Sequence, residues 1–188
     1  MTAERRERIL SLTHELGALT YGDFTLSSGE RSTYYFDGRL LSLNPEGAGL
    51  LGPEFLEVVI ASGAEAIGGL TLGADPIVSS VVLTSYLQGC PIQGFLVRKE
   101  AKGHGAGRLI EGPLKPGSNV LIVDDACSTG GSLFQAIVAA EAEGCKVVHV
   151  AAIIDRHQGG GEELARRGYA FTALLESSSD GVIHPVGN

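Results

Sequence analysis

The sequence predicts an α/β fold built on an open, doubly wound and mostly parallel sheet. Apolar runs repeatedly end in small or polar residues, and a segment with helical periodicity follows several of them. These runs are continuous rather than alternating, which is typical of parallel strands covered on both faces. We therefore expect polar loops at the carboxyl edge of the sheet, where open α/β sheets bind ligands.

Composition narrows the class of protein. The chain has 188 residues, of which 44% are hydrophobic and 19% charged, and its formal net charge is −8. This length suggests one domain with a full core. The acidic balance argues against a general nucleic-acid or membrane surface. Neither a membrane-spanning stretch nor a secretory apolar region is recognisable, so we expect a cytoplasmic protein without nucleic-acid or membrane partners.

The first part of the chain predicts packing elements. A helix is indicated by apolar residues that recur on one face, namely Ile9, Leu12, Leu16 and Leu19. Two short extended segments, 24–26 and 34–36, flank a turn. Asn44 then caps a helix that runs toward Ser62 and that Pro53 is expected to interrupt.

The rest of the chain alternates between strands and helices. The expected strands are Ala66–Leu70, Pro91–Arg98, Val120–Val123, Cys145–Ile154 and Tyr169–Leu175. The expected helices run from Pro76 through Leu87, from Leu133 to Glu141, and through a short stretch that ends at Arg167. Two strand-loop-helix units therefore place small-residue loops at the carboxyl edge of the sheet, one after Leu70 and one after Val123.

The run from Val120 to Ser132 carries the strongest chemical signal. Its apolar strand ends in Asp124 and Asp125, and small or hydroxylated residues then lead into a helix. Free backbone N–H groups at a helix N-terminus bind phosphate. Two carboxylates would repel a bare phosphate, so we expect them to face sugar hydroxyls, a metal or a developing positive charge. A phosphorylated sugar satisfies these demands. The alternative is a simple helix cap, for which one carboxylate suffices.

The cysteines point to no separate chemistry. Cys90, Cys127 and Cys145 are odd in number and lack metal-ligand spacing. Cys127 stands at a helix start, where the pKa of a thiol falls and its reactivity rises. No histidine lies near it in the sequence, which favours a small spacer over a nucleophile.

The segment 98–108 is the one dense basic stretch of this acidic chain. It carries a net charge of +3 before His104 is counted. Its alternate glycines, Gly103, Gly105 and Gly107, resemble a dinucleotide loop, but no helix follows them. A solvated charged loop is the alternative interpretation. The position directly after a sheet strand favours a lid that clamps a polyanion.

These residues also carry a family resemblance. The run from Val120 to Ser132 resembles the signature of type I phosphoribosyltransferases, which bind phosphoribosyl pyrophosphate (PRPP). From Phe24 onward the chain is similar to the orotate phosphoribosyltransferases, through residues 24–37, residues 98–105 and the Asp155–Arg156 pair. The resemblance implies transfer of the phosphoribosyl group from PRPP to orotate, in UMP synthesis. It also implies a small N-terminal hood, approximately residues 1–45, packed on a core of residues 46–188.

The resemblance implies a role for each matching residue. The PRPP-binding set would be Thr71, Gly73, Arg98, Lys99, Lys102, His104, Asp124, Asp125, Ala126, Cys127, Ser128, Thr129, Gly130, Gly131 and Ser132. The orotate-binding set would be Tyr35, Phe36, Ser128 and Arg156. Lys102, His104, Asp124 and Asp125 would be catalytic. Mg²⁺ would be held mainly by PRPP and water, near Asp124 and Asp125, without dedicated protein ligands. In a homodimer, the lid 98–108 would close over the partner's site.

Two departures and two alternatives accompany the resemblance. Some family members carry lysine where Ser27 and Gly73 stand here, so the roles of these positions are open. A purine phosphoribosyltransferase would share the PRPP motif but would leave Arg156 and the basic segment without their roles. A non-catalytic, PRPP-sensing regulator that binds RNA or DNA would need a basic face, which the net charge of −8 does not favour.

Overall fold

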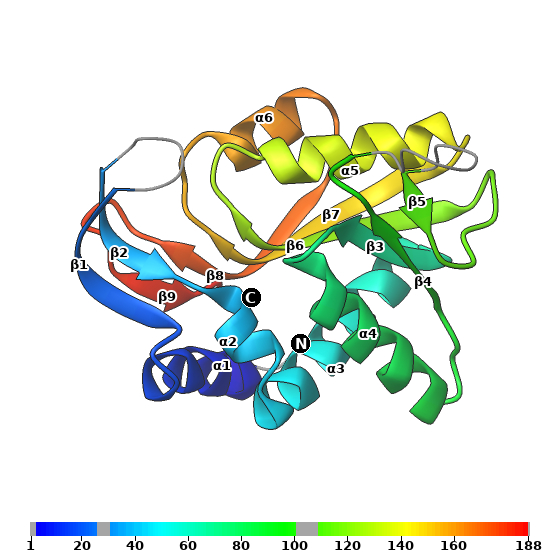
Figure 1. The fold of residues 1–188 in the computed structure, drawn as a ribbon. Helices are drawn as coiled ribbons and strands as arrows, with labels where there is room; N and C mark the ends of the chain where they lie inside the picture. The colour runs from blue at the N-terminus through cyan, green and yellow to red at the C-terminus, as the bar shows by residue number, and fades with distance from the viewer. Residues whose placement is uncertain (1–2, 26–30, 101–108, 188) are drawn as a thin grey trace.

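The computed structural model describes residues 3–25, 31–100 and 109–187 and has the predicted α/β architecture. Its main sheet has seven strands in the order β5-β4-β3-β6-β7-β8-β9 (Figure 1). These strands are β3 (Ala66–Leu70), β4 (Gln93–Val97), β5 (Ile110–Glu111), β6 (Asn119–Cys127), β7 (Lys146–Asp155), β8 (Phe171–Ser177) and β9 (Ile183–Pro185). The five inner strands pair in parallel, and β5 and β9 pair antiparallel at the edges.

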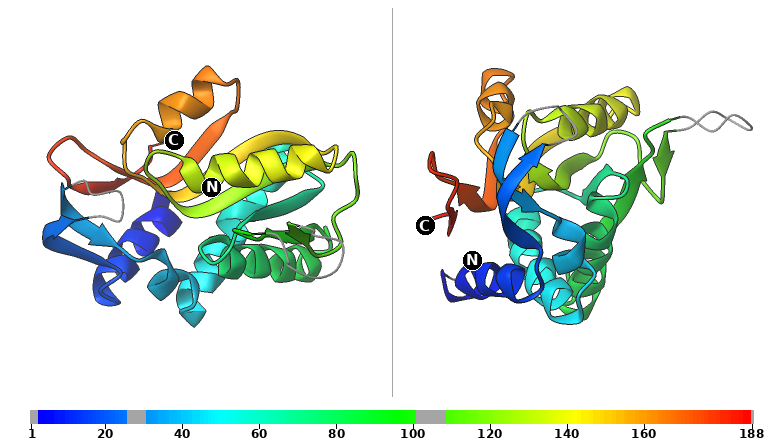
Figure 2. Two further views of the ribbon diagram at one scale, coloured as in Figure 1. Left: turned by 45° about the horizontal axis from the view of Figure 1, so that its top comes forward. Right: turned by 60° about the vertical axis from the view of Figure 1, so that its left-hand side comes forward.

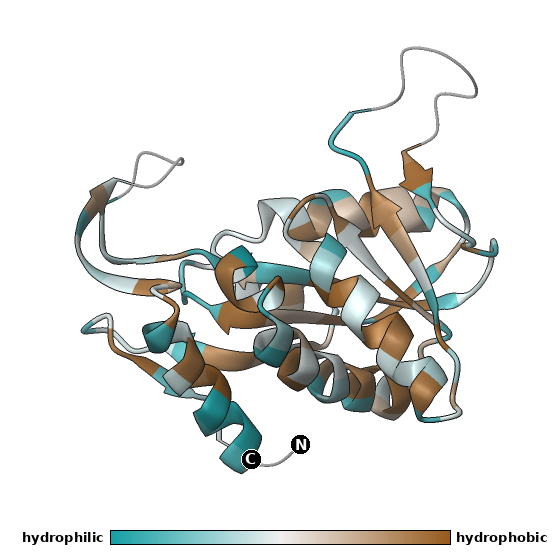
Figure 3. Ribbon diagram, turned by 60° about the horizontal axis from the view of Figure 1, so that its bottom comes forward, coloured by the Kyte–Doolittle hydropathy of each residue, from teal (hydrophilic) through white to brown (hydrophobic). Residues whose placement is uncertain are grey.

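Helices cover both faces of this sheet. They are α1 (Ala3–Glu15), α2 (Gly38–Ser42), α3 (Pro45–Ser62), α4 (Ala74–Leu87), α5 (Gly131–Ala142) and α6 (Gly160–Arg166). Helices α5 and α6 lie on one face and α1 to α4 on the other, as the views of Figure 2 also show. Figure 3 shows the second group, in which hydrophobic and hydrophilic residues alternate along the helices. No helix among the described residues is both long and apolar enough to cross a membrane.

The side chains of β6 point alternately into the two halves of the hydrophobic core. Leu121 and Val123 belong to the hydrophobic cluster on the α3 and α4 side, and Val120 and Ile122 belong to the cluster under α5. All four side chains are fully buried. Successive strand residues point to opposite faces, so only a strand covered on both sides requires such a continuous apolar run.

Strand pairing brings the two predicted loops together. β3 pairs in parallel with β6, with Ala66 opposite Val120 and Gly68 opposite Ile122. Both strands therefore end at the same edge of the sheet. The loop after Leu70 and the acids Asp124 and Asp125 meet there.

Helix α3 differs from the expectation, because it continues across Pro53 without interruption. A proline inside a helix costs about 3 kcal/mol, through the lost hydrogen bond and the ring clash. The side chains of Leu51, Phe55 and Val59 are fully buried on this helix. Their burial offsets the loss, since tertiary packing rather than local propensity provides most helix stability in proteins.

The N-terminal segment forms a second, two-stranded antiparallel sheet from β1 (Leu19–Thr25) and β2 (Arg31–Phe36). Its apolar side chains, among them Ile9, Phe36 and Leu41, belong to the same hydrophobic cluster as Leu121. The edge strand β9 contacts α1, and the Ile183 N–H donates to Tyr21 Oη at 3.4 Å. The segment thus packs on the main sheet through a continuous core, and its division into hood and core stays a prediction.

A buried ion pair between α1 and α3 generates a stability prediction. Glu54 is fully buried, and its carboxylate lies 2.6 Å from Arg5 Nη1 and 3.7 Å from Nε of the buried Arg6. Glu54→Ala would leave Arg6 without this carboxylate, so we expect the free energy of unfolding to fall by about 3 kcal/mol in urea titrations. Glu57, which is 41% exposed and also pairs with Arg5, is the matched control. Glu57→Ala should cost about 1 kcal/mol or less. Equal losses would contradict this account.

Candidate active site

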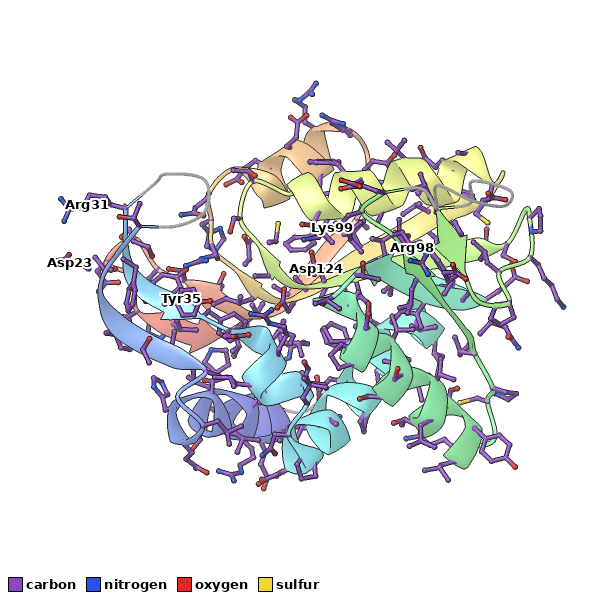
Figure 4. All side chains as sticks on the ribbon, in the orientation of Figure 1. Asp23, Arg31, Tyr35, Arg98, Lys99 and Asp124 are labelled. Atoms are coloured by element: carbon purple, nitrogen blue, oxygen red, sulfur yellow. The ribbon has the colours of Figure 1, made fainter. Side chains whose placement is uncertain are left out.

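Two adjacent carboxylates at the end of β6 form the centre of the candidate site (Figure 4). The Asp124 side chain is 6% exposed, and its Oδ1 accepts a hydrogen bond from the Asp125 N–H at 2.9 Å. The backbone of two other segments packs directly against the pair. A Cβ atom on Gly73 would lie 2.7 Å from Asp125 Oδ1, and one on Gly38 would lie 2.6 Å from Asp125 Cβ. Glycine at these positions lets the two segments enclose the acids.

The acid pair is electrostatically unfavourable as it stands. Burial raises the pKa of Asp124, and the charge of neighbouring Asp125 raises it further. Burial also raises the pKa of Asp125, although a hydrogen bond with Asp124 and the positive charge of Arg39 oppose this shift. A ligand that brings hydroxyl donors or positive charge stabilises such desolvated carboxylates.

A cavity of about 380 Å³ opens above the acid pair. Its lining comes from four segments of the chain and consists of Arg39, Leu70, Thr71, Leu72, Gly73, Lys99, Asp124, Asp125 and Ser132. Lys99 and Asp124 lie close together in Figure 4, and the Lys99 charge lowers the pKa of Asp124. The lining of the cavity thus combines two carboxylates with two cationic side chains.

A second cavity of about 410 Å³ adjoins the first and shares Ser132 with it. It is lined by Thr25, Tyr35, Ala126, Ser128, Thr129, Gly130, Gly131, Ser132, Leu133 and Arg156. Gly130, at φ 81°, begins α5, and no side chain in the described part of the chain caps this helix. The N–H groups of the first turn therefore face this cavity with the positive end of the helix dipole behind them, as a phosphate requires.

Arg156 lines the second cavity and is held by residues of β2. Its Nε donates to Tyr34 Oη at 3.2 Å, its Nη2 donates to the Tyr34 carbonyl at 3.3 Å, and its guanidinium carbon lies 4.7 Å from the centre of the Tyr34 ring. Ser32 Oγ is its other acceptor, at 3.5 Å. All these partners among the described residues are neutral. The charge of Arg156 is therefore oriented but available to an anionic group.

The structure brings most of the predicted residues together. Thr71, Gly73, Lys99, Asp124 and Asp125 line the first cavity. Tyr35, Arg156, Ala126 and the loop residues from Ser128 to Ser132 line the second. Lys102, His104 and Ser27 lie outside the described residues.

Three predicted residues lie elsewhere. Phe36 is buried in the hydrophobic cluster and lines neither cavity. Side chains alternate along a strand, so that of Phe36 points to the other face of β2 from that of Tyr35. Arg98 pairs with Glu111 on β5 at 2.8 Å and also lines neither cavity. The Cys127 side chain is fully buried, and burial together with nearby carboxylates, Asp155 first among them, raises the pKa of its thiol to about 12. This opposes a nucleophilic role and agrees with a spacer.

Sequence reasoning missed three polar residues at the site: Tyr34, Asp37 and Arg39. Tyr34 holds Arg156, and Asp37 holds Arg39. Only their position in the sequence could have indicated them. Asp37, Gly38 and Arg39 directly follow the strand that carries the predicted site residue Tyr35. No spacing rule pairs them with acids that stand far along the chain.

Comparison with known proteins places this chain in a family. Residues 68–171 match the family described as phosphoribosyl transferase domain. Orotate phosphoribosyltransferase from Rhodopirellula baltica is 45% identical over 166 residues, which cover 85% of this chain and 86% of that protein. The enzyme from Corynebacterium glutamicum is 40% identical over 182 residues, covering 97% of each chain. The crystal structure of Mycobacterium tuberculosis orotate phosphoribosyltransferase in complex with PRPP superposes with a TM-score of 0.76 at 33% identity, covering 92% of this chain and 96% of that one.

The buried acid pair predicts an unusual dependence of stability on pH. Because the pKa of Asp124 is raised in the folded state, this state binds the proton more tightly, and stability falls as the pH rises from about 4 through the folded pKa. Asp124→Asn keeps the acceptor for the Asp125 N–H and removes the charge. We expect it to raise the free energy of unfolding on the order of 1 kcal/mol at pH 7 and to have little effect near pH 4. Urea titrations at both pH values would contradict this if the variant were not stabilised at pH 7.

Proposed function

The chain belongs to the orotate phosphoribosyltransferase family, and from this we propose that it transfers the 5-phosphoribosyl group of PRPP to orotate. The products are orotidine 5-monophosphate and pyrophosphate, so the reaction is a pentosyl transfer in UMP synthesis. One observation supports this most strongly. Two adjoining cavities combine buried acids, a helix start without a side-chain cap, and an oriented arginine whose described partners are neutral.

PRPP fits the cavities through its three parts. The 5-phosphate would bind the N–H groups between Ser128 and Ser132 at the start of α5. The ribose hydroxyls would donate to Asp124 and Asp125, which relieves part of the cost of burying these carboxylates. The diphosphate would then occupy the first cavity beside Thr71 and Lys99.

Orotate fits the other end of the second cavity. Its carboxylate would pair with Arg156, whose described partners are all neutral. Its ring would lie along Tyr35, which is 42% exposed, and beside Ser128. The buried position of Phe36 gives no support to a contact between its side chain and the ring, so this role stays a prediction.

The residues provide the electrostatics that the reaction requires. Displacement of pyrophosphate from the anomeric carbon develops positive charge on the ribose and negative charge on the leaving group. Asp124 and Asp125 would stabilise the first charge, and Lys99 would stabilise the second. Both groups are in place before the reaction, so little reorganisation is needed. Enclosure of the ribose would also exclude the water that could hydrolyse PRPP.

Magnesium fits the donor set of the first cavity. Among the described residues no group of three or more His, Cys, Asp or Glu side chains is arranged to hold a metal ion. Two carboxylates in an open cavity suit an ion that keeps several waters and binds chiefly through substrate phosphates. When bound, Mg²⁺ would neutralise charge on the diphosphate. Asp124 and Asp125 would be its nearest protein groups.

We also propose a homodimer in which the segment 98–108 of one subunit acts at the partner's site. Exposed apolar side chains on α4 support the association, since Leu83, Tyr86 and Leu87 are 60%, 75% and 73% exposed. Lys102 and His104 would reach the diphosphate from this segment. Neither the purine nor the regulatory alternative receives support from the relatives above. A cytoplasmic location is part of the proposal, and recovery of the protein in a membrane or secreted fraction would contradict it.

The function is tested by following orotate absorbance after addition of PRPP, with and without Mg²⁺. We expect consumption of orotate that depends on Mg²⁺, and no consumption of adenine, hypoxanthine or uracil. Arg156→Gln should lower kcat/KM for orotate about 100-fold, because it removes a charge-assisted bond to the carboxylate. Arg167 is the matched control, since its guanidinium lies 4.2 Å from the Phe134 ring outside both cavities. Arg167→Gln should keep near wild-type values. Turnover of a purine base instead of orotate would contradict the proposal.

Mixed dimers test the arrangement of the subunits. Lys102→Ala should lower turnover far more than product binding, and Asp125→Asn should impair the other half of the site. Co-expression of the two variants would give heterodimers with one intact site if the segment acts across the interface. Random pairing then restores about a quarter of wild-type activity. Activity that stays at the level of the separate variants would contradict a segment acting on the partner's site.

A further inference from the structure

Arg39 reaches the first cavity from the N-terminal segment, although no motif marks it. It stands in the first turn of α2, next to Gly38, which is buried directly against Asp125. Its side chain is 47% exposed and lines the cavity together with Lys99 and the acids. A cation from outside the main sheet is therefore built into the wall of the cavity that would hold the diphosphate.

Asp37 fixes the direction of the Arg39 guanidinium. The Asp37 side chain caps α2 by accepting from the Arg39 N–H at 3.1 Å. The same carboxylate accepts from Nε at 2.9 Å and from Nη2 at 3.0 Å. This contact lowers the pKa of Asp37, so the pair is ionised at neutral pH. A two-point contact holds the planar guanidinium in one orientation.

Part of the guanidinium remains available. Asp37 occupies Nε and one Nη2 donor, and Nη1 has no hydrogen-bond partner among the described residues. Asp125 influences Arg39 electrostatically, yet the described residues contain no ion pair between them. The free N–H groups thus point to a role other than simple neutralisation of the acid. Arginine binds phosphate oxygens at two points, which matches this geometry.

We infer that Arg39 is a further substrate-binding residue, whose free N–H groups hold the diphosphate of PRPP and the pyrophosphate product opposite Lys99. The inference rests on the proposed function. A diphosphate beside Asp124 and Asp125 would be repelled by them, and Arg39 with Lys99 supplies the cations that the described part of this cavity contains. Asp37 is then the positioning residue that presents Arg39.

The test measures pyrophosphate binding directly, by titration calorimetry of the full-length protein in the presence of Mg²⁺. We expect Arg39→Gln to weaken pyrophosphate binding about tenfold, as the loss of a charge-assisted hydrogen bond predicts. In steady-state assays the KM for PRPP should rise similarly, while the KM for orotate stays within about twofold, since Arg156 lies in the other cavity. Arg39→Lys should recover part of the affinity. Asp37→Asn, which keeps an acceptor for the cap, should give an intermediate loss.

Arg8 provides the matched control. It also belongs to the N-terminal segment, is 38% exposed and is ion-paired, to Glu15 and Glu46, but lines neither cavity. Arg8→Gln should leave pyrophosphate binding unchanged.

Two results would overturn the inference. One is wild-type pyrophosphate affinity in a folded Arg39→Gln protein. The other is an equal loss for orotate and PRPP together with a lower unfolding midpoint, which would mean a purely structural role. Pyrophosphate binding that depends on Arg39, in a protein that does not consume orotate, would support the inference and count against the proposed substrate.

Discussion

The burial of two adjacent carboxylates at the end of β6 is the constraint on which the rest of the site depends. Desolvation raises the pKa of both acids, and the charge of Asp125 raises that of Asp124 further, so the fold keeps them at a cost. Other features of the site are arranged around the two buried acids. Gly38 and Gly73 admit backbone directly against Asp125, Lys99 places positive charge near Asp124, and α5 offers its N-terminus just beyond. A buried pair of this kind is understandable where a ligand supplies the missing hydrogen bonds and positive charge.

The N-terminal segment orients both cationic ends of the site. β2 supplies Tyr34, which holds Arg156 at one end, and the residue after β2 is Asp37, which holds Arg39 at the other. The main sheet supplies the acids and the glycine-containing loop that follows them. Shared apolar packing, with Phe36 and Leu121 in one cluster, fixes the two parts together. The orientation of both arginines thus depends on one short hairpin and the turn after it.

Local patterns were sufficient to predict the five inner strands of the sheet and its central loop. The expected strand Ala66–Leu70 has the bounds of β3, and the acids lie at the end of a buried strand as expected. The sequence predictions failed where tertiary contacts determine the structure. Burial of its apolar side chains lets α3 continue across Pro53. β9 is too short to show an alternating hydrophobic pattern. Tyr34 and Arg39 were missed because their importance lies in contacts with residues distant in sequence. Phe36 lines neither cavity for a simpler reason, since the side chains of neighbouring strand residues point to opposite faces.

A crystal structure of this protein with PRPP bound tests the central claim most directly. We expect the ribose hydroxyls within hydrogen-bond distance of Asp124 and Asp125, and the 5-phosphate on the backbone N–H groups between Ser128 and Ser132. The diphosphate should lie in the cavity shared by Lys99 and Thr71. PRPP bound away from β6, or bound there with its ribose turned from both carboxylates, would contradict the account.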